Sequence, residues 1–271
     1  MSMSTLVCFN TACWICAQIL SFIAFHFPGK FENQSVYYGK SHLLAPDDSV
    51  LEIWIPIKLG ELLLTAYLFI FDFPFIYILP LIVPCWVIAN LFQCLWQFTL
   101  RPSYRYSPWI GSMYVTIAAF SIMYMHSTIS KAVAARSSWG DKFPLLISRI
   151  PLSIHMVWLF VVCLESMNSW ADTRKLQMSS KVMIAKISTF VAAIAGAGLT
   201  YVWHDPVISL VFAWTLGAIE SNTRQNLQRS TKIAGIQTTL ITMEAMFSRI
   251  LMGSFYMQCF YDAMLYARSK P

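Results

Sequence analysis

Long apolar runs separated by short polar connections repeat along the whole chain. A helix needs about twenty apolar residues to cross a ~30 Å hydrocarbon core. The pattern predicts eight helices, at about residues 5–27, 51–71, 76–98, 108–129, 147–168, 183–203, 206–221 and 236–266. The seventh segment is short, so a count of seven spans stays open, and the eighth is longer than one span, which indicates tilt or an interfacial end.

Polar and proline residues set the expected boundaries. A polar loop is expected at 28–50, and Lys131 to Lys142 is expected to be a longer loop before the fifth helix. Pro80 and Pro84 lie in the first half of the third helix and would kink it unless neighbours satisfy the freed carbonyls. The sixth helix contains the small-residue run AAIAGAGLT. Small residues let helices approach closely in lipid, so this face is expected to pack against protein.

Composition supports a membrane protein. The chain is 57% hydrophobic and 12% charged, whereas a soluble domain is about 25% charged. The net charge of +6 does not indicate nucleic-acid binding, because the basic residues are scattered through connections without forming a patch. These residues are modestly enriched after the first, third, fifth and seventh predicted helices, which favours the cytosolic or matrix side for those connections. The predicted fold class is an all-α integral membrane protein, a polytopic bundle of about eight transmembrane helices.

The cysteines do not indicate a disulfide framework. They number seven and fall mostly inside apolar runs, and an odd number in such positions argues against paired bridges. Cys13 and Cys16 fit C-x-x-C, but they lie in a predicted transmembrane helix rather than near a βαβ unit. We expect buried small hydrophobic residues here, in preference to metal or redox use. No metal and no cofactor are expected.

Four segments, in order, resemble TspO-like tryptophan-rich sensory proteins. The first is Pro46 with Trp54 eight residues later, within LLAPDDSVLEIWIPIKL, which is similar to the P-x-G-x-x-F-x-x-W signature. The others are ANLFQCLW at 89–96, RIPLSIHMVW at 149–158 and the stretch from Asp205 to Glu220. The last two resemble elements of the longer, bacterial-type members.

The resemblance implies a bundle of tilted helices with a five-helix core and extra C-terminal helices in longer members. It places a TspO-like core at 5–170 and additional helices at 183–266, within a single transmembrane domain covering 1–271. Small members bind tetrapyrroles and sterol-like or drug-like ligands in a pocket between helices. They reside in outer mitochondrial or bacterial membranes, so a mitochondrial membrane is the expected location.

The chain also departs from the family pattern. Lys58 stands where the family usually has an aromatic residue, and Gln93 replaces the Asn before Trp96. Ser166 takes the place of the Asn expected eight positions after Trp158. These departures fall mainly on positions that face the pocket, so we expect the fold to be kept more closely than the ligand.

The predicted ligand cleft lies between the second, third and fifth helices. Its candidate residues are Trp54, Lys58, Glu61, Trp96, His155 and Trp158. The tryptophans either line the cleft or serve as packing and interface residues. Lys58 and Glu61 are three positions apart and share a helical face, so they either neutralise one another or meet a substrate carboxylate or a partner subunit.

Other ionisable residues lie in the fifth and last predicted helices. His155 and Glu165 are ten positions apart, so they share one stripe of the fifth helix but lie too far apart along it to share a metal. Satisfied polar residues inside the bundle are expected there, in preference to a proton relay. Glu244 and Arg249 in the last helix are expected to pair with other helices or with another chain.

The motifs of the chain favour a non-enzymatic protein. The chain has no G-x-S-x-G, Walker A, G-x-G-x-x-G or H-x-x-x-H pattern. The first hypothesis is an accessory or structural subunit of a larger membrane complex, in contact with lipids and other membrane subunits. The alternative is a binding protein or transporter for a hydrophobic ligand such as a tetrapyrrole, sterol or lipid. A weaker enzymatic alternative uses Glu61 or Glu165 as an acid.

Overall fold

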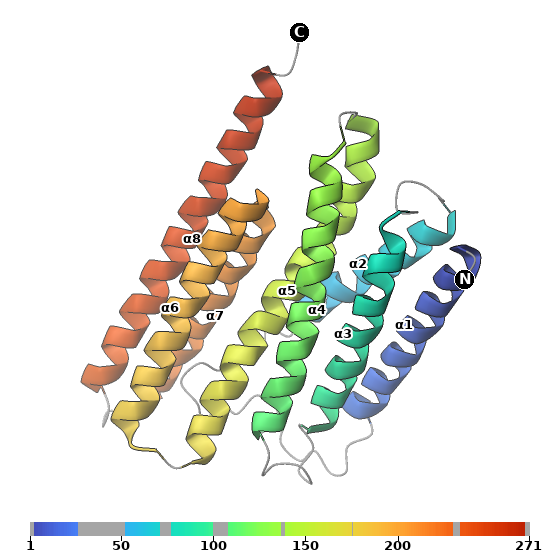
Figure 1. Cartoon of the computed structure of the whole chain (residues 1–271). Helices are drawn as coiled ribbons and strands as arrows, with labels where there is room; N and C mark the ends of the chain where they lie inside the picture. The colour runs from blue at the N-terminus through green and yellow to red at the C-terminus, as the bar shows by residue number, and fades with distance from the viewer. Residues whose placement is uncertain are drawn as a thin grey trace. The chain divides into compact units, whose positions relative to one another are not determined.

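The chain is described here from a computed structural model. The structure describes residues 3–26, 52–70, 77–99, 108–136, 139–174, 176–229 and 234–268. Within these ranges every regular element is helical apart from turns: α1 (Met3–His26), α2 (Trp54–Ile70), α3 (Leu79–Thr99), α4 (Pro108–Ala134), α5 (Trp139–Thr173), α6 (Met178–Trp203), α7 (Pro206–Arg229) and α8 (Ala234–Arg268) (Figure 1). The all-α prediction with eight helices is confirmed. The Pro46 turn and the basic connection from Arg101 to Arg105 lie outside the described residues.

The predicted long loop between the fourth and fifth helices is wrong. α4 continues to Ala134 and α5 begins at Trp139, although α5 contains Pro144 and Pro151. The reason is packing, because side chains at helical spacing in the first half of α5 are buried: Leu145, Ser148 and Leu152. Burial of one face stabilises a helix more than sequence propensity does.

The seventh helix is longer than the sequence predicted. α7 has 24 residues, which corresponds to about 36 Å at 1.5 Å per residue. Its buried stripe continues through Leu216, Ile219 and Thr223, so tertiary packing extends the helix past Glu220. This length would cross a ~30 Å hydrocarbon core, but residues 220–229 are mostly polar, so the choice between seven and eight spans stays a prediction.

Three helices meet length and apolarity criteria for crossing a membrane within the described ranges: Leu79–Thr99, Lys142–Ala171 and Met178–Trp203. The α6 helix also presents an outward apolar face, because Met183, Ile187, Phe190 and Ile194 are all exposed. A helix with apolar residues on its outer side is typical of contact with lipid. The chain is a polytopic integral membrane protein.

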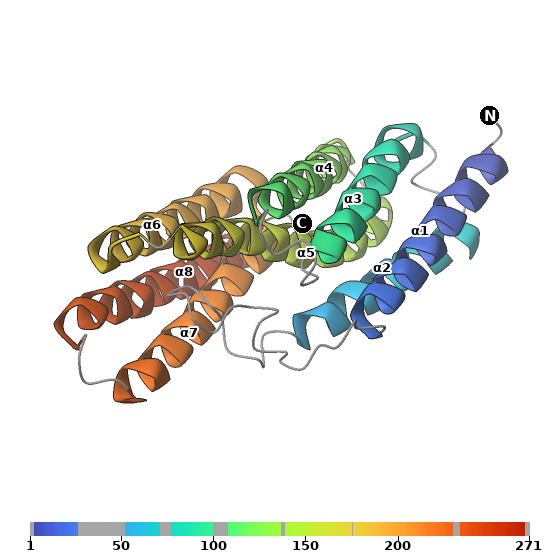
Figure 2. The ribbon, with the colours of Figure 1, turned by 90° about the horizontal axis from the view of Figure 1, so that it is seen from below.

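The chain divides into two compact units, and the boundary falls inside α5, between Ser166 and Met167. In unit 1, α3 packs against α4 and α1, and α1 also contacts α2 (Figure 1). In unit 2, α8 packs against both α7 and α6, and α6 contacts α7 (Figure 2). Each unit is therefore a helix bundle with its own core.

Glycine at position 196 allows α6 to approach α7 and α8 closely. A Cβ at Gly196 would lie 2.7 Å from Leu251 Cδ2 and 3.0 Å from Phe212 Cδ2. Two residues later, Gly198 has no atom within 4 Å of the same hypothetical Cβ. The small-residue run therefore packs against protein on the side of Gly196, as predicted, while its other side is open.

A tight turn joins α6 to α7 at the predicted His204-Asp205-Pro206. His204 adopts a left-handed conformation with φ 48°, and its backbone N–H bonds to the Thr200 carbonyl, which is a common way to end a helix. Asp205 Oδ1 then accepts a hydrogen bond of 3.1 Å from the Val207 backbone N–H, which caps the start of α7.

Candidate functional site

Unit 1 contains a buried carboxylate. Glu61 on α2 is 1% exposed. Its Oε2 lies 3.0 Å from Lys58 Nζ and accepts a hydrogen bond of 3.2 Å from Trp14 Nε1 on α1. Its Oε1 lies 2.8 Å from His155 Nδ1 on α5. The predicted pairing of Lys58 with Glu61 is confirmed, and we call these four residues, together with Gln93, the Glu61 cluster.

His155 connects the cluster to α3. Its Nε2 lies 3.0 Å from Gln93 Oε1, and the edge of its ring meets the Trp54 ring at a centroid distance of 6.0 Å. His155 is fully enclosed. When the His155 imidazole is neutral, the positive charge of Lys58 balances the negative charge of Glu61, so the cluster carries no net charge. An ionised carboxylate inside a membrane bundle requires such a partner.

Close contact between α2 and α5 brings the cluster together. A Cβ at Gly60 would overlap the Pro151 ring. Only glycine leaves enough space for α2 to approach α5 at this point, one residue before Glu61. Small residues have this role at many helix contacts in membranes.

Aromatic rings cover the cluster on one side. Trp54 meets the fully buried Trp158 edge to face at 6.1 Å between centroids, with an interplanar angle of 86°. Lys58 Nζ lies 5.4 Å from the centroid of the Trp54 ring, within the range of a cation–π interaction. Aromatic and charged groups therefore share the same interior region.

Five of the six predicted site residues lie together: Trp54, Lys58, Glu61, His155 and Trp158. The sixth, Trp96, is buried elsewhere on α3, where its Cδ1 would lie 3.5 Å from a Cβ at Gly111 of α4. Gln93, one turn earlier, is the α3 residue that reaches His155. In the sequence, Gln93 stood out only as a departure from the family pattern, and no motif indicated a role for Trp14.

Several buried polar atoms near this region have no hydrogen-bond partner among the described residues. They are Trp158 Nε1, Trp86 Nε1, Gln93 Nε2 and Gln97 Oε1. Residues 86, 93 and 97 fall at helical spacing on α3, so they share one face. Buried polar groups in proteins are nearly always paired, which makes these atoms candidates for contacts with a bound molecule.

The remaining predicted polar positions are Glu165 in unit 1 and Glu244 and Arg249 in unit 2. Glu165 is buried on α5, and Asn168 donates a hydrogen bond of 2.9 Å to Ser188 of α6. Glu244 is buried in unit 2, whereas Arg249 is exposed and has no ion pair in the part of the chain that is described. The proton relay through Glu165 stays untested.

The predicted burial of the C-x-x-C pair is wrong, because Cys16 is exposed and Cys13 is only partly buried. Every described cysteine is free, and Cys163 Sγ lies 3.0 Å from Thr116 Oγ1. Within the described ranges, no group of three His, Cys, Asp or Glu side chains is arranged to hold a metal ion.

Neither a curated protein nor a solved structure matches the chain. A protein-family model does match, and its description is TSPO-like protein. The match covers residues 5–252, which includes all of unit 1 except its first four residues and most of unit 2. Together with the all-helical structure, this match shows that the chain belongs to the TSPO-like protein family of polytopic membrane bundles.

Proposed function

We propose that this protein is a non-enzymatic accessory subunit of a larger membrane protein complex, with a mitochondrial membrane as the expected location. The observation that carries the proposal is the exposed apolar surface of residues 255–264, here called the terminal α8 segment. Five large side chains in it are exposed: Tyr256, Met257, Phe260, Tyr261 and Met264.

We infer from the length of α8 that this segment lies at the edge of the membrane. The helix has 35 residues, or about 52 Å, and a tilt of about 40° still leaves about 40 Å along the membrane normal. The hydrocarbon core is only ~30 Å thick. The Tyr261 ring stacks on His204 at the α6–α7 turn, with 6.0 Å between centroids, and α8 continues past that turn (Figure 1).

The chemistry of the segment suits contact with protein. Tyrosine is common at the membrane interface in any case, but Met257 and Phe260 there would be exposed to headgroup water. Methionine and phenylalanine are enriched at protein interfaces. An apolar helix face of this kind fits a groove on a partner subunit.

The Glu61 cluster supports the non-enzymatic part of the proposal. Lys58 and His155 both contact Glu61 inside unit 1, so the carboxylate is occupied by its own helices. These contacts act as a clamp that holds α1, α2, α3 and α5 together. They also mean that Lys58 and Glu61 need no partner subunit for neutralisation, so the proposed interface lies at the terminal α8 segment.

The test is a Met257→Lys substitution in the native membrane. Mild detergent extraction is expected to release the unaltered chain in a large particle with defined companions, and Met257→Lys is expected to reduce that association. Met183→Lys is the matched control, since Met183 is 64% exposed near the start of α6 and Met257 is 71% exposed. Equal association of the two variants, or an unaltered chain that runs as a small particle, would refute the proposal.

A second function is favoured by the unpaired donors beside the cluster. We propose as the alternative that an apolar ligand with hydrogen-bond acceptors binds between α3 and α5, where Trp158 Nε1, Trp86 Nε1 and Gln93 Nε2 lack partners. Tetrapyrroles and oxygenated sterols carry suitable acceptors. A hydrogen bond from each of these donors to the ligand would offset the free-energy cost of burying an unpaired N–H group.

Trp158→Phe tests this alternative, because it removes the N–H group while keeping an aromatic ring. Tetrapyrrole or sterol binding is expected to weaken about tenfold, the equivalent of about 1.4 kcal/mol for one hydrogen bond. Trp96→Phe is the control, since Trp96 lies by Gly111 of α4. Binding isotherms that are identical for Trp158→Phe and the unaltered chain would exclude the ligand role of Trp158.

A further inference from the structure

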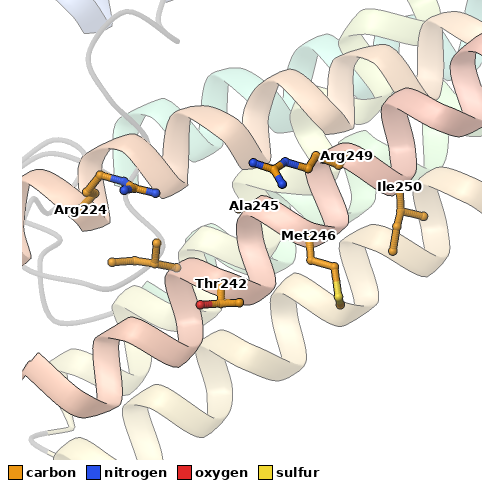
Figure 3. Close-up of a pocket in the computed structure, with 7 residues that line it drawn as sticks. Arg224, Thr242, Ala245, Met246, Arg249 and Ile250 are labelled. Atoms are coloured by element: carbon orange, nitrogen blue, oxygen red, sulfur yellow. The ribbon is translucent and has the colours of Figure 1, made fainter.

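A groove with a volume of about 580 Å³ runs along α8 in unit 2. One of its lining residues, Arg224, comes from α7, and the others come from α8: Ile241, Thr242, Ala245, Met246, Arg249 and Ile250 (Figure 3). The α8 residues recur at intervals of four, so they form two adjacent stripes on one helix face. The groove therefore combines an apolar floor with two cationic side chains.

The two arginines converge on the groove. In Figure 3 the Arg224 and Arg249 side chains extend toward one another from neighbouring helices. Two like charges directed at the same space repel each other. An anion between them would remove that repulsion and accept hydrogen bonds from both guanidinium groups.

The groove has an excess of positive charge. Arg224 forms an ion pair with Glu220, one turn earlier on α7. Arg249 has no ion pair within the described residues, and its own helix offers only Ala245, Met246, Met252 and Gly253 at the neighbouring positions. One cationic group in the groove is therefore left without a counter-charge.

The position of Arg249 within α8 points to an occupant from the bilayer. It lies six residues before the terminal α8 segment, or about 9 Å along the helix axis, so it is closer to the proposed membrane edge than to the start of α8 at Ala234. A long arginine side chain near the membrane edge reaches the lipid headgroup layer. Next to it, Met246 and Ile250 offer an exposed apolar surface.

We propose that this groove binds an anionic phospholipid. The lipid phosphate lies between Arg224 and Arg249, and an acyl chain follows the apolar stripe past Ile241, Met246 and Ile250. Arginine binds phosphate with two parallel hydrogen bonds. A zwitterionic lipid such as phosphatidylcholine is a weaker ligand because its own ammonium group offsets the phosphate charge. The site is independent of the terminal α8 segment and of the Glu61 cluster.

The test compares lipids bound to the purified full chain. Native mass spectrometry and thermal unfolding are measured in nanodiscs of phosphatidylcholine, with and without phosphatidylglycerol. Phosphatidylglycerol is expected to raise the unfolding temperature and to remain bound. The Arg224→Gln/Arg249→Gln variant is expected to lose at least about tenfold in affinity. Lys186→Gln removes one charge from α6 of the same unit outside the groove and is expected to behave as the unaltered chain.

Two further variants distinguish lipid binding in the groove from lipid binding through general surface charge. Ala245→Phe keeps both arginines but fills the floor, and it is expected to reduce lipid binding as well. Arg249→Gln alone carries the test if the double variant does not fold, because Arg249 is exposed and has no ion pair in the described residues. Equal retention of phosphatidylcholine and phosphatidylglycerol, or unchanged binding in Arg249→Gln and Ala245→Phe, would overturn the proposal.

Inorganic phosphate and glycerol phosphate distinguish the source of the anion. Neither carries an acyl chain, so both are expected to stabilise the protein much less than phosphatidylglycerol does. Stabilisation of equal size by inorganic phosphate would assign the groove to a free anion and overturn the lipid proposal.

Discussion

Glu61→Gln is expected to destabilise the protein by about 3–5 kcal/mol, the usual cost of breaking a buried ion pair by removing one partner. The substitution leaves the partly buried Lys58 ammonium, which lies 3.0 Å from the carboxylate, without its counter-charge. His155 loses its contact at 2.8 Å at the same time. Reversible unfolding in detergent, followed by helical circular dichroism, measures the effect.

Glu52→Gln is the matched control for this experiment. It makes the same chemical change just before α2, at an exposed position, where surface substitutions change stability by about 0.5 kcal/mol or less. Adding Lys58→Met to Glu61→Gln is expected to recover part of the loss, because the uncompensated charge is then removed. If Glu61→Gln is as stable as Glu52→Gln, the Glu61 cluster does not clamp the helices.

Gly60→Ala is expected to destabilise the protein by about 1–3 kcal/mol, which is the typical cost of forcing extra volume into a packed core. The added methyl group overlaps the Pro151 ring, and a proline ring cannot rotate away. Relief requires α2 to move from α5, which also stretches the contact between Glu61 and His155. The loss is measured by the same unfolding experiment.

Gly198→Ala provides the comparison within a helix. No atom lies within 4 Å of a Cβ at that position, so only the helix preference of alanine acts, which favours the helix by about 0.5–1 kcal/mol. Gly198→Ala is therefore expected to be neutral or stabilising. A Gly60→Ala variant that matches it would show that α2 and α5 do not approach as described.

Hydrophobic pattern alone predicted the fold class and the number of helices. Apolar runs of membrane-spanning length are a local property, so the sequence displays them directly. The pairing of Lys58 with Glu61 was predictable for the same reason, since their spacing of three is determined by helix geometry. Helix ends were less predictable: α5 begins at Trp139 and α7 continues to Arg229, because buried faces extend helices through polar residues and prolines.

The composition of the site depended on contacts between helices. The sequence indicated Trp54, Lys58, Glu61, His155 and Trp158 through family resemblance and charge, but it could not show that Trp14 on α1 reaches Glu61 or that Gln93, rather than Trp96, reaches His155. Those contacts join residues 47 and 62 positions apart. The groove between Arg224 and Arg249 also exists only where α7 packs on α8. The sequence alone thus determined a polytopic helical membrane protein, while tertiary packing decided which polar groups meet, because side chains distant in the chain become neighbours only after the helices associate.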